Sequence, residues 1–332
     1  MNLYKVAVVG GLGLVGTSLI KILIDEKFPI SELIVYGSED GEAIIENIEY
    51  HIRKLDDKSI ESFDFVFFCS NEAVSEQYAE KFASLGAYVI DNSSYFRLKD
   101  NIPLVVPEIN ASDLLNGSKI IANPNCTTIM ILLALNPLLD KYKLERFYAS
   151  TYQATSGAGK EGLNQYICEK VHLDYKNKVL PNKLLEKSSI FDNLIPIVDV
   201  LLDSGYTSEE MKVRLESKKI LHLDKLEIST TAVRVPTSIG HGASIFAIFE
   251  EKVNVEEAIR LFGEAAYLRV YNDPHYPTLS SVRGTPYVGV GRIRRDLDCE
   301  YTLNFFVTSD NLIRGASYNA YKIALKLVEY NK

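Results

Sequence analysis

The first part of the chain alternates short apolar runs with stretches of helical periodicity. Apolar spacing predicts a helix from the glycines at 10–16 to about Lys27, and a second helix over residues 75–86 with Gly86 as its C-cap. Strand and helix in alternation predict a parallel, doubly wound sheet. The runs that predict its buried strands, rich in β-branched and aromatic residues, are 3–9, 32–36, 63–69 and 87–91.

The pattern changes beyond about residue 145, where the strand-like runs become longer. Such runs suit a larger, partly antiparallel sheet. They are residues 145–155, 226–235, 242–250 and 299–308. Before them, residues 104–106 and 119–122 predict two short strands and residues 127–139 predict an apolar helix. Residues 311–330 predict a last helix with an apolar stripe, and the polar segment 174–193 predicts a surface excursion.

Chain length and this change of pattern together predict two domains. At roughly 150 residues per domain, 332 residues correspond to about two. We expect an N-terminal domain over residues 1–125, with the C-terminal helix at 311–332 packing back on it. A second domain, of the α+β class with a mixed sheet, is expected over residues 126–310. The fold class is therefore α/β, with the two kinds of sheet in separate domains.

The charge balance restricts the partners of the chain. Lys and Arg number 36 and Asp and Glu number 44, which gives a net charge of −8. A chain this acidic has no overall attraction for nucleic acid or an anionic membrane. An anionic small molecule would therefore have to be held by a local group of cations or backbone donors.

The cysteines and the N-terminal segment indicate a cytoplasmic protein. The four cysteines are dispersed and form no CxxC pair, so we expect free thiols in a reducing compartment and no metal site. Residues 6–20 are apolar, but they contain several glycines and lack a cleavage site. They therefore predict a strand, a turn and a helix of the folded protein, and not a signal peptide. No apolar run approaches the length of a membrane span.

A glycine-rich turn follows the first predicted strand and opens the first predicted helix. Its G-x-G-x-x-G pattern lets a pyrophosphate approach backbone N–H groups at a helix N-terminus, where the helix dipole favours negative charge. In this context the pattern predicts a Rossmann-type dinucleotide site. The candidate cofactor residues are Gly10, Gly11, Leu12, Gly13, Leu14, Val15 and Gly16.

The loop after the second predicted strand bears on the choice of cofactor. An acidic residue about 20 residues beyond the glycines favours NAD, whereas a nearby Arg favours NADP. Here the loop contains Ser38, Glu39 and Asp40 and no cation. Its local chemistry therefore favours NAD.

Cys126 and His241 are the candidate catalytic pair. Cys126 lies in NPNCTT, between a strand and an apolar helix, where a helix N-terminus stabilises a thiolate. A lone cysteine is as often a buried core residue, and its position alone does not decide between the two. His241 is flanked by glycines between two strand-like runs, whereas the other four histidines lie among polar residues. A nucleophilic thiol with a dinucleotide and an acid/base indicates aldehyde–thioester chemistry.

At this point the chain resembles the aspartate-β-semialdehyde dehydrogenase family. The resemblance covers nearly the whole chain, and its order and spacing are similar to the family throughout. Besides the glycine turn, the motifs are DNSSYFR at 91–97, VPEIN at 106–110, NPNCTT at 123–128, YQATSGAG at 152–159, EEMK at 209–212, RVPTSIGH at 234–241 and DNLIRGASYNA at 310–320.

The resemblance implies a reaction and a role for each matching residue. The family reduces aspartyl-β-phosphate to aspartate semialdehyde and phosphate through a Cys thioester, in the biosynthesis of aspartate-family amino acids. Cys126 would be the nucleophile, His241 the acid/base, and Gln153 would orient the acyl-enzyme. Arg234 would pair with the α-carboxylate, a bidentate guanidinium task. Glu209 would bind the α-amino group, and Asn125 would lie beside the acyl group. Arg97 and Lys212 would bind the phosphate. The cofactor would also contact Ser38, Ser156, Gly157 and Asn311.

The resemblance also implies NADP as the cofactor and a homodimer or homotetramer as the assembly.

Three positions depart from the family pattern. Ser38-Glu39 stands where an Arg-Ser pair is usual, which keeps NAD open beside NADP. Gly242-Ala243 replaces Ser-Glu after the histidine, and Lys322 replaces a glutamine. Two alternatives stay open: a reductase of another acyl phosphate or of a CoA thioester on the same fold, and an inactive dinucleotide-binding paralogue.

Overall fold

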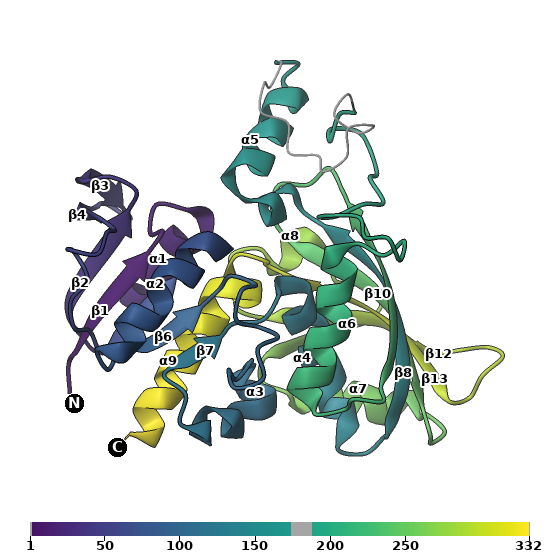
Figure 1. Cartoon of the computed structure of the whole chain (residues 1–332). Coiled ribbons are helices and arrows are strands. Elements are labelled where there is room, and N and C mark those ends of the chain that lie inside the picture. The colour runs from purple at the N-terminus through teal and green to yellow at the C-terminus, as the bar shows by residue number, and fades with distance from the viewer. Residues whose placement is uncertain (1, 174–187, 332) are drawn as a thin grey trace. The chain divides into compact units, whose positions relative to one another are not determined.

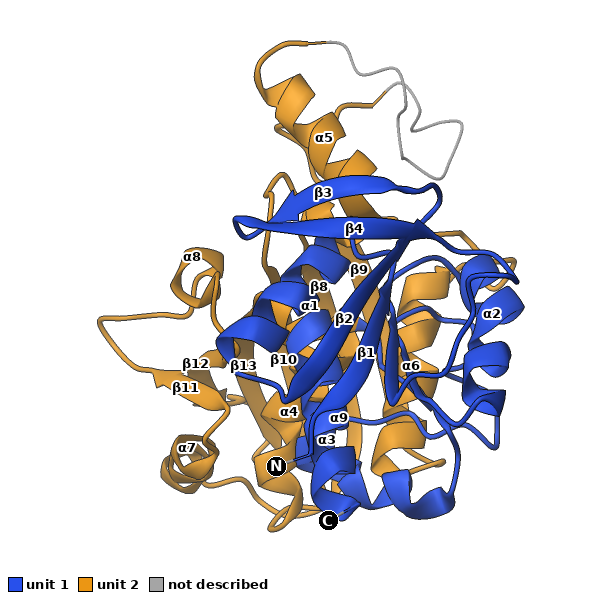
Figure 2. Cartoon of the chain, turned by 90° about the vertical axis from the view of Figure 1, so that its left-hand side faces the viewer, with its two compact units in different colours: residues 1–125, 316–332 blue, residues 126–315 orange. Residues whose placement is uncertain are grey.

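The computed structural model describes residues 2–173 and 188–331, so most of the segment predicted as a surface excursion, 174–187, lies outside the described residues. The chain divides into two compact units (Figure 2). Unit 1 consists of Met1–Asn125 and Ala316–Lys332, and unit 2 is Cys126–Gly315.

Unit 1 is built on a seven-stranded sheet (Figure 1). Its elements are β1 (Tyr4–Val9), α1 (Leu14–Asp25), β2 (Ile30–Gly37), β3 (Gly41–Ile45), β4 (Ile48–Lys54), β5 (Phe65–Phe68), α2 (Glu72–Ser84), β6 (Tyr88–Asp91), α3 (Pro107–Asn110), η1 (Ala111–Asn116), β7 (Ile120–Ala122) and α9 (Tyr318–Tyr330). The strand order is β3-β4-β2-β1-β5-β6-β7, parallel throughout except for the β3–β4 hairpin. The predicted parallel sheet is confirmed, whereas the hairpin was not expected.

Helices cover both faces of this sheet, because side chains along a strand point alternately to its two sides. Phe68 of β5 packs on Phe82 of α2, with ring centroids 6.0 Å apart. Phe65, on the opposite face of the same strand, meets Phe28, which in turn meets Tyr321 of α9. The sheet is therefore doubly wound, and its central strands β1 and β5 are buried on both sides.

Unit 2 is built on a six-stranded mixed sheet (Figure 1). Its elements are α4 (Cys126–Leu139), β8 (Leu144–Gln153), η2 (Thr155–Ala158), α5 (Gly159–Lys170), α6 (Ser208–Leu221), β9 (Glu227–Arg234), β10 (His241–Phe249), α7 (Val255–Glu264), β11 (Leu268–Tyr271), α8 (Leu279–Val282), β12 (Val288–Arg295) and β13 (Thr302–Ser309). The strand order is β11-β12-β13-β10-β8-β9. The pairs β8–β9 and β11–β12 are parallel and the others antiparallel, which confirms the predicted mixed sheet.

Three predicted elements are wrong in extent, each for a local reason. Residues 104–106 make a single bridge, from Leu104 to Ala122, because Pro107 starts a helix directly after them. Cys299 does not begin a strand; the Asp296 carboxylate accepts its N–H in a turn, and β13 starts later.

The C-terminal helix also starts later than predicted. Asp310 Oδ1 accepts the N–H groups of Leu312 and Ile313, which holds the chain in a turn. A wider helical turn, η3 (Ile313–Ser317), follows, and α9 begins only at Tyr318.

The glycine turn of unit 1 allows a direct test of its packing. A Cβ on Gly16 would lie 2.3 Å from the Gly10 carbonyl oxygen, which is main chain and has no room to move. We predict that Gly16→Ala lowers the free energy of unfolding by about 2–3 kcal/mol, measured by urea denaturation. Gly41→Ala is the control, because a Cβ there meets nothing within 4 Å. Equal stability of the two variants would contradict this account of the turn.

Candidate active site

The register of the unit 2 sheet brings three predicted site residues to one edge. Gln153 ends β8 and pairs in register with Arg234, which ends the parallel strand β9. The antiparallel strand β10 starts at the same edge, where Gly242 pairs with Tyr152 and His241 is its first residue. All three side chains are buried.

Cys126 is the first residue of α4, a helix whose next turns are apolar and fully buried. Its thiol is not in a disulfide bond, and no acidic residue lies in the first turn of the helix. A thiolate at this position gains from the helix dipole. The helix start thus agrees with the predicted nucleophile position.

Arg234 is a buried cation among acidic groups. Burial lowers the pKa of its guanidinium, and the charges of Glu209, Cys126 and Asp199 oppose that shift. The Cys126 sulfur is therefore close enough to Arg234 for a thiolate to be stabilised by it.

Glu209 lies in the first turn of α6, where Thr207 caps the helix. It is 5% exposed and accepts a hydrogen bond from Gln153 Nε2 at 3.0 Å. Its other carboxylate oxygen is 3.7 Å from Lys212 Nζ. The structure thus brings Gln153, Glu209, Lys212 and Arg234 into one charged network.

Lys212 has a partner that the sequence analysis missed. Its Nζ lies 2.5 Å from Asp199 Oδ2. Burial raises the pKa of Asp199, but the hydrogen bond and charge of Lys212 outweigh burial and the net pKa is lowered. No motif marks Asp199, because it lies in a loop before α6 and outside the EEMK motif that contains Lys212.

His241 is held by the main chain of Ala154. Its Nδ1 accepts the Ala154 N–H at 3.1 Å, and its Nε2 is buried without a hydrogen-bond partner in the described part of the chain. The Ala154 carbonyl accepts from Arg234 Nη1 at 2.6 Å. Burial first, and then the Arg234 charge, lower the pKa of His241 to about 3. The imidazole is therefore neutral at neutral pH.

Gly157 packs closely against this pair. A Cβ there would lie 2.9 Å from Arg234 Nη1 and 3.2 Å from His241 Nε2. Next to it, Ser156 and Asn311 exchange side-chain hydrogen bonds, and Asn311 Oδ1 also accepts the Gly240 N–H. Two of the predicted cofactor residues of unit 2, Ser156 and Asn311, therefore form a buried polar network at the sheet edge that carries His241.

The predicted residues of unit 1 lie at the carboxyl edge of its own sheet. The glycine turn follows β1, and no acidic residue in the first turn of α1 opposes an anion. Arg97 is 8% exposed and donates to the carbonyls of Asn92 and Asn123, which follow β6 and β7. Asn125 is buried and precedes Cys126 in the chain, and Ser38 is exposed at the end of β2.

Two departures from the family pattern have local explanations. Gly242 lies close to Phe306, whose ring would be 3.1 Å from a Cβ at that position. Lys322 of α9 lies 4.0 Å from Glu108 of α3. Neither contact involves the residues proposed for chemistry.

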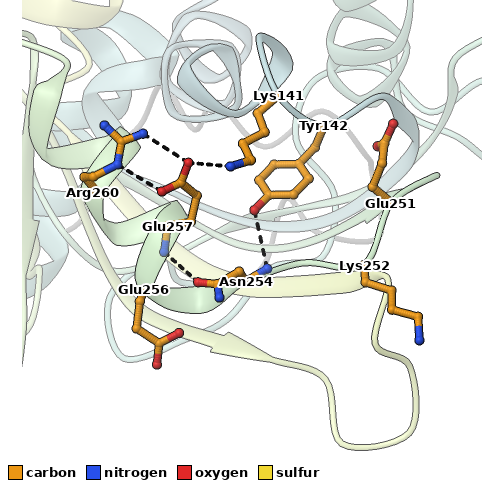
Figure 3. A pocket seen from close by; sticks show the side chains of 8 residues that line it. All are labelled: Lys141, Tyr142, Glu251, Lys252, Asn254, Glu256, Glu257 and Arg260. Carbon is orange, nitrogen blue, oxygen red and sulfur yellow. Dashed lines mark hydrogen bonds and ion pairs between the residues drawn. The ribbon is translucent and has the colours of Figure 1, made fainter.

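A pocket of about 570 Å³ elsewhere in unit 2 contains none of the predicted site residues (Figure 3). Its central charges are paired, since Glu257 accepts from both Lys141 and Arg260. Asn254 caps α7 through the Glu257 N–H. These contacts stabilise the start of a helix and suggest no chemistry.

Neither a metal site nor a membrane span emerges from the described residues. Residues 2–173 and 188–331 contain no group of three or more His, Cys, Asp and Glu side chains placed to hold a metal ion. Over the same residues, no helix has the length and apolar character needed to cross a membrane.

The thiol at a helix start, the buried guanidinium and the dinucleotide-type turn stand in a chain that matches the class of the semialdehyde dehydrogenases. Residues 5–117 match the family model described as "Semialdehyde dehydrogenase, NAD binding domain". Residues 135–314 match the one described as "Semialdehyde dehydrogenase, dimerisation domain".

Comparison with individual proteins identifies the family within this class. The aspartate-semialdehyde dehydrogenase of Aquifex aeolicus is 38% identical, over 98% of both chains. The structure of aspartate semialdehyde dehydrogenase II of Vibrio cholerae, complexed with ASA, is similar with a TM-score of 0.92, 30% identity and 99% coverage of both chains. The Candida albicans enzyme with NADP shares the fold at a TM-score of 0.76, with 22% identity over 99% of both chains. The chain belongs to the aspartate-semialdehyde dehydrogenase family.

The close packing at Gly157 gives a test that separates function from folding. In Gly157→Ala the new methyl group would push the flexible Arg234 end and His241 out of place while leaving the main chain intact. We predict at least a tenfold loss of kcat/KM with aspartate semialdehyde, because small misplacements of reacting groups lower rates strongly. Gly263→Ala is the control, since a Cβ there meets nothing within 4 Å. Unchanged kinetics in Gly157→Ala would contradict a role for the present positions of Arg234 and His241.

Proposed function

We propose that this chain reduces aspartyl-β-phosphate to aspartate semialdehyde with release of phosphate, through a thioester on Cys126. The observation that carries the proposal is the joint presence, in unit 2, of Cys126 at a helix start and of Arg234, whose buried charge interacts with it. Membership of the family, and a relative complexed with ASA, support the same substrate.

The proposed substrate matches the charges of the site. Its α-carboxylate would pair with the buried Arg234 guanidinium, and its α-amino group with Glu209, which is already held by Gln153. Lys212 would exchange its ion pair with Asp199 for one with the phosphate. Arg97 would be the second cation for this group. Asn125 would lie beside the acyl group, since it adjoins Cys126 in the chain.

The reaction needs one nucleophile and one leaving group. The Cys126 sulfur attacks the acyl carbon, and the bond from that carbon to the phosphate oxygen breaks, so that inorganic phosphate leaves and a thioester remains. A bound NAD(P)H would supply the hydride that reduces this thioester. The electron pair of the C–S bond then returns to sulfur, which frees the aldehyde.

We propose NADP as the cofactor, held by the glycine turn of unit 1. The match to an NAD-binding family model and the family default support this choice. The loop after β2 keeps NAD as the alternative, because Ser38 and Glu39 are exposed there and Asp40 Oδ1 is bound to the Lys54 N–H. Two carboxylates near the ribose would weaken binding of a 2′-phosphate. Four cysteines without a disulfide bond also support a cytoplasmic location.

The test is oxidation of aspartate semialdehyde in the presence of phosphate, run with NADP and with NAD. We expect turnover that requires phosphate, and we expect Cys126→Ser to lower kcat at least about 10³-fold while dinucleotide affinity stays the same. Cys168→Ser is the matched control and should keep full activity. Turnover retained by Cys126→Ser would overturn the nucleophile. Turnover with another acyl phosphate or a CoA thioester alone would change the substrate.

We also propose a homodimer formed through the outer face of the unit 2 sheet. The match to a dimerisation-domain model supports it. On this face Phe246 and Tyr148 are cross-strand partners, and they are 41% and 42% exposed. Exposed aromatic pairs on a sheet favour burial against a partner.

Substitution on this face tests the dimer. We predict that Phe246→Arg raises the dimer dissociation constant at least tenfold in sedimentation equilibrium, because it would place a charge in an apolar contact. Leu297→Arg changes a fully exposed side chain in a turn of unit 2 and should leave the dissociation constant unchanged. A stable dimer of Phe246→Arg would place the interface elsewhere, and a tetramer would require a second one.

A further inference from the structure

The chain segment before α6 carries a carboxylate to the site of unit 2. Ile195 exchanges two main-chain hydrogen bonds with Arg234, of 3.0 and 2.8 Å, so the segment pairs with the end of β9. The Val200 N–H donates to Ser208 Oγ, and the Val200 carbonyl accepts the N–H of Ser208, the first residue of α6. Asp199 lies between these two attachments. They fix its carboxylate beside the first turns of the helix.

The main chain at Asp199 has a left-handed conformation, with φ of 68°. Residues other than glycine adopt this conformation uncommonly, although Asp and Asn tolerate it best. It persists only where the surrounding structure holds it, and it occurs often at ligand-binding sites. Here the hydrogen bonds of Ile195 and Val200, on either side, hold it. An outlier of this kind motivates a functional hypothesis for its side chain.

The Asp199 carboxylate neutralises the cation that the proposed function gives to the phosphate. Its Oδ2 lies 2.5 Å from Lys212 Nζ, whereas the Glu209 carboxylate lies 3.7 Å from the same nitrogen. The charge of Asp199 also acts on the buried Arg234 guanidinium. Among these four side chains the two positive charges and the two negative charges cancel. Before a ligand binds, this group of residues therefore has no excess positive charge with which to attract an anion.

A phosphate can replace Asp199, because the displaced carboxylate can be solvated. The Asp199 side chain is 43% exposed, whereas the Lys212 side chain is 24% exposed. The Ser208 hydroxyl, which hydrogen-bonds the Asp199 carboxylate, remains as a partner after the exchange. A phosphate dianion brings more charge to Lys212 than the carboxylate does, whereas a singly charged anion brings no more. The exchange therefore weakens the binding of every anion and favours dianions.

We propose that Asp199 is an internal counter-ion that competes with phosphate for Lys212, and that it thereby sets the affinity and the charge selectivity of the phosphate site. The proposal rests on the proposed function, in which Lys212 binds phosphate. Because Lys212 must exchange partners, phosphate binds less tightly than the cations alone would allow. Phosphate released on formation of the thioester can therefore leave more readily. The role of Asp199 is indirect, since it acts through Lys212.

The first test measures binding of inorganic phosphate to the protein without substrate or cofactor, by isothermal titration calorimetry at fixed ionic strength. We expect Asp199→Asn to lower the dissociation constant of phosphate at least about fivefold, because it removes one charge of a close pair. Asn tolerates the left-handed conformation, so this variant should keep the fold. Asp199→Gly, for which that conformation is unstrained, should act in the same direction.

Asp203→Asn is the matched control for this titration. Asp203 is exposed in the same loop, and the substitution makes the same change in net charge, so phosphate should bind as it does to the wild type. In a Lys212→Met background the gain from Asp199→Asn should disappear. A fivefold gain retained there would show that Asp199 does not act through Lys212, and would overturn the proposal. Weaker or equal binding of phosphate in Asp199→Asn, or no binding by either protein, would overturn it as well.

The second test uses the phosphate-dependent oxidation of aspartate semialdehyde. We expect Asp199→Asn to lower the KM for phosphate at least about fivefold and to leave the KM for aspartate semialdehyde within about twofold. A general loss of structure would change both values. An unchanged KM for phosphate in an active enzyme would overturn the role of Asp199 and leave the proposed function standing. Absence of turnover in the wild type, with the phosphate affinities as expected, would instead reject the proposed function.

Discussion

The parallel pairing of β8 with β9 is the constraint on which the site of unit 2 depends. It sets Gln153 opposite Arg234, and the antiparallel strand β10 then starts with His241 at the same edge. A slip of one residue would turn each of these side chains to the other face of the sheet. The inner face of β8 is fixed by Phe147 and Ala149, which are buried. The core packing of the sheet therefore determines the geometry of the chemistry.

The site holds buried charge that a purely structural core would avoid. Arg234 is 8% exposed and Glu209 is 5% exposed, and burying such groups costs stability unless they are closely paired. Their mutual attraction, and the bond from Gln153 to Glu209, offset part of that penalty. In the proposed function, the cation, the acid and the imidazole would be oriented before any substrate arrives. Preorganised groups of this kind are the main source of rate in polar reactions.

Much of this structure could be predicted from the sequence, because strong periodicity and rigid turn residues act locally. The buried strand at β1, the helix α4 and the glycine turn follow from such signals. The hairpin β3–β4 could not be predicted in this way. Its residues are mostly exposed and show no clear alternation of polar and apolar positions, and its turn has positive φ at Glu46 and Asn47. Motifs marked Gln153, Arg234 and His241, which the unit 2 sheet brings to one edge. Asp199 and the Ala154 main chain were missed, because one is a loop residue outside the motifs and the other acts through its backbone.

The most direct test of the thioester account is to trap the acyl group on the enzyme. Aspartate semialdehyde and oxidised NADP, mixed with the protein in the absence of phosphate, should transfer hydride once and leave the acyl group on sulfur. Rapid acid quenching and peptide mass spectrometry should then find an added aspartyl group on the peptide that contains Cys126, and phosphate added before the quench should remove it. Hydride transfer without any adduct, or an adduct on another residue, would contradict the account.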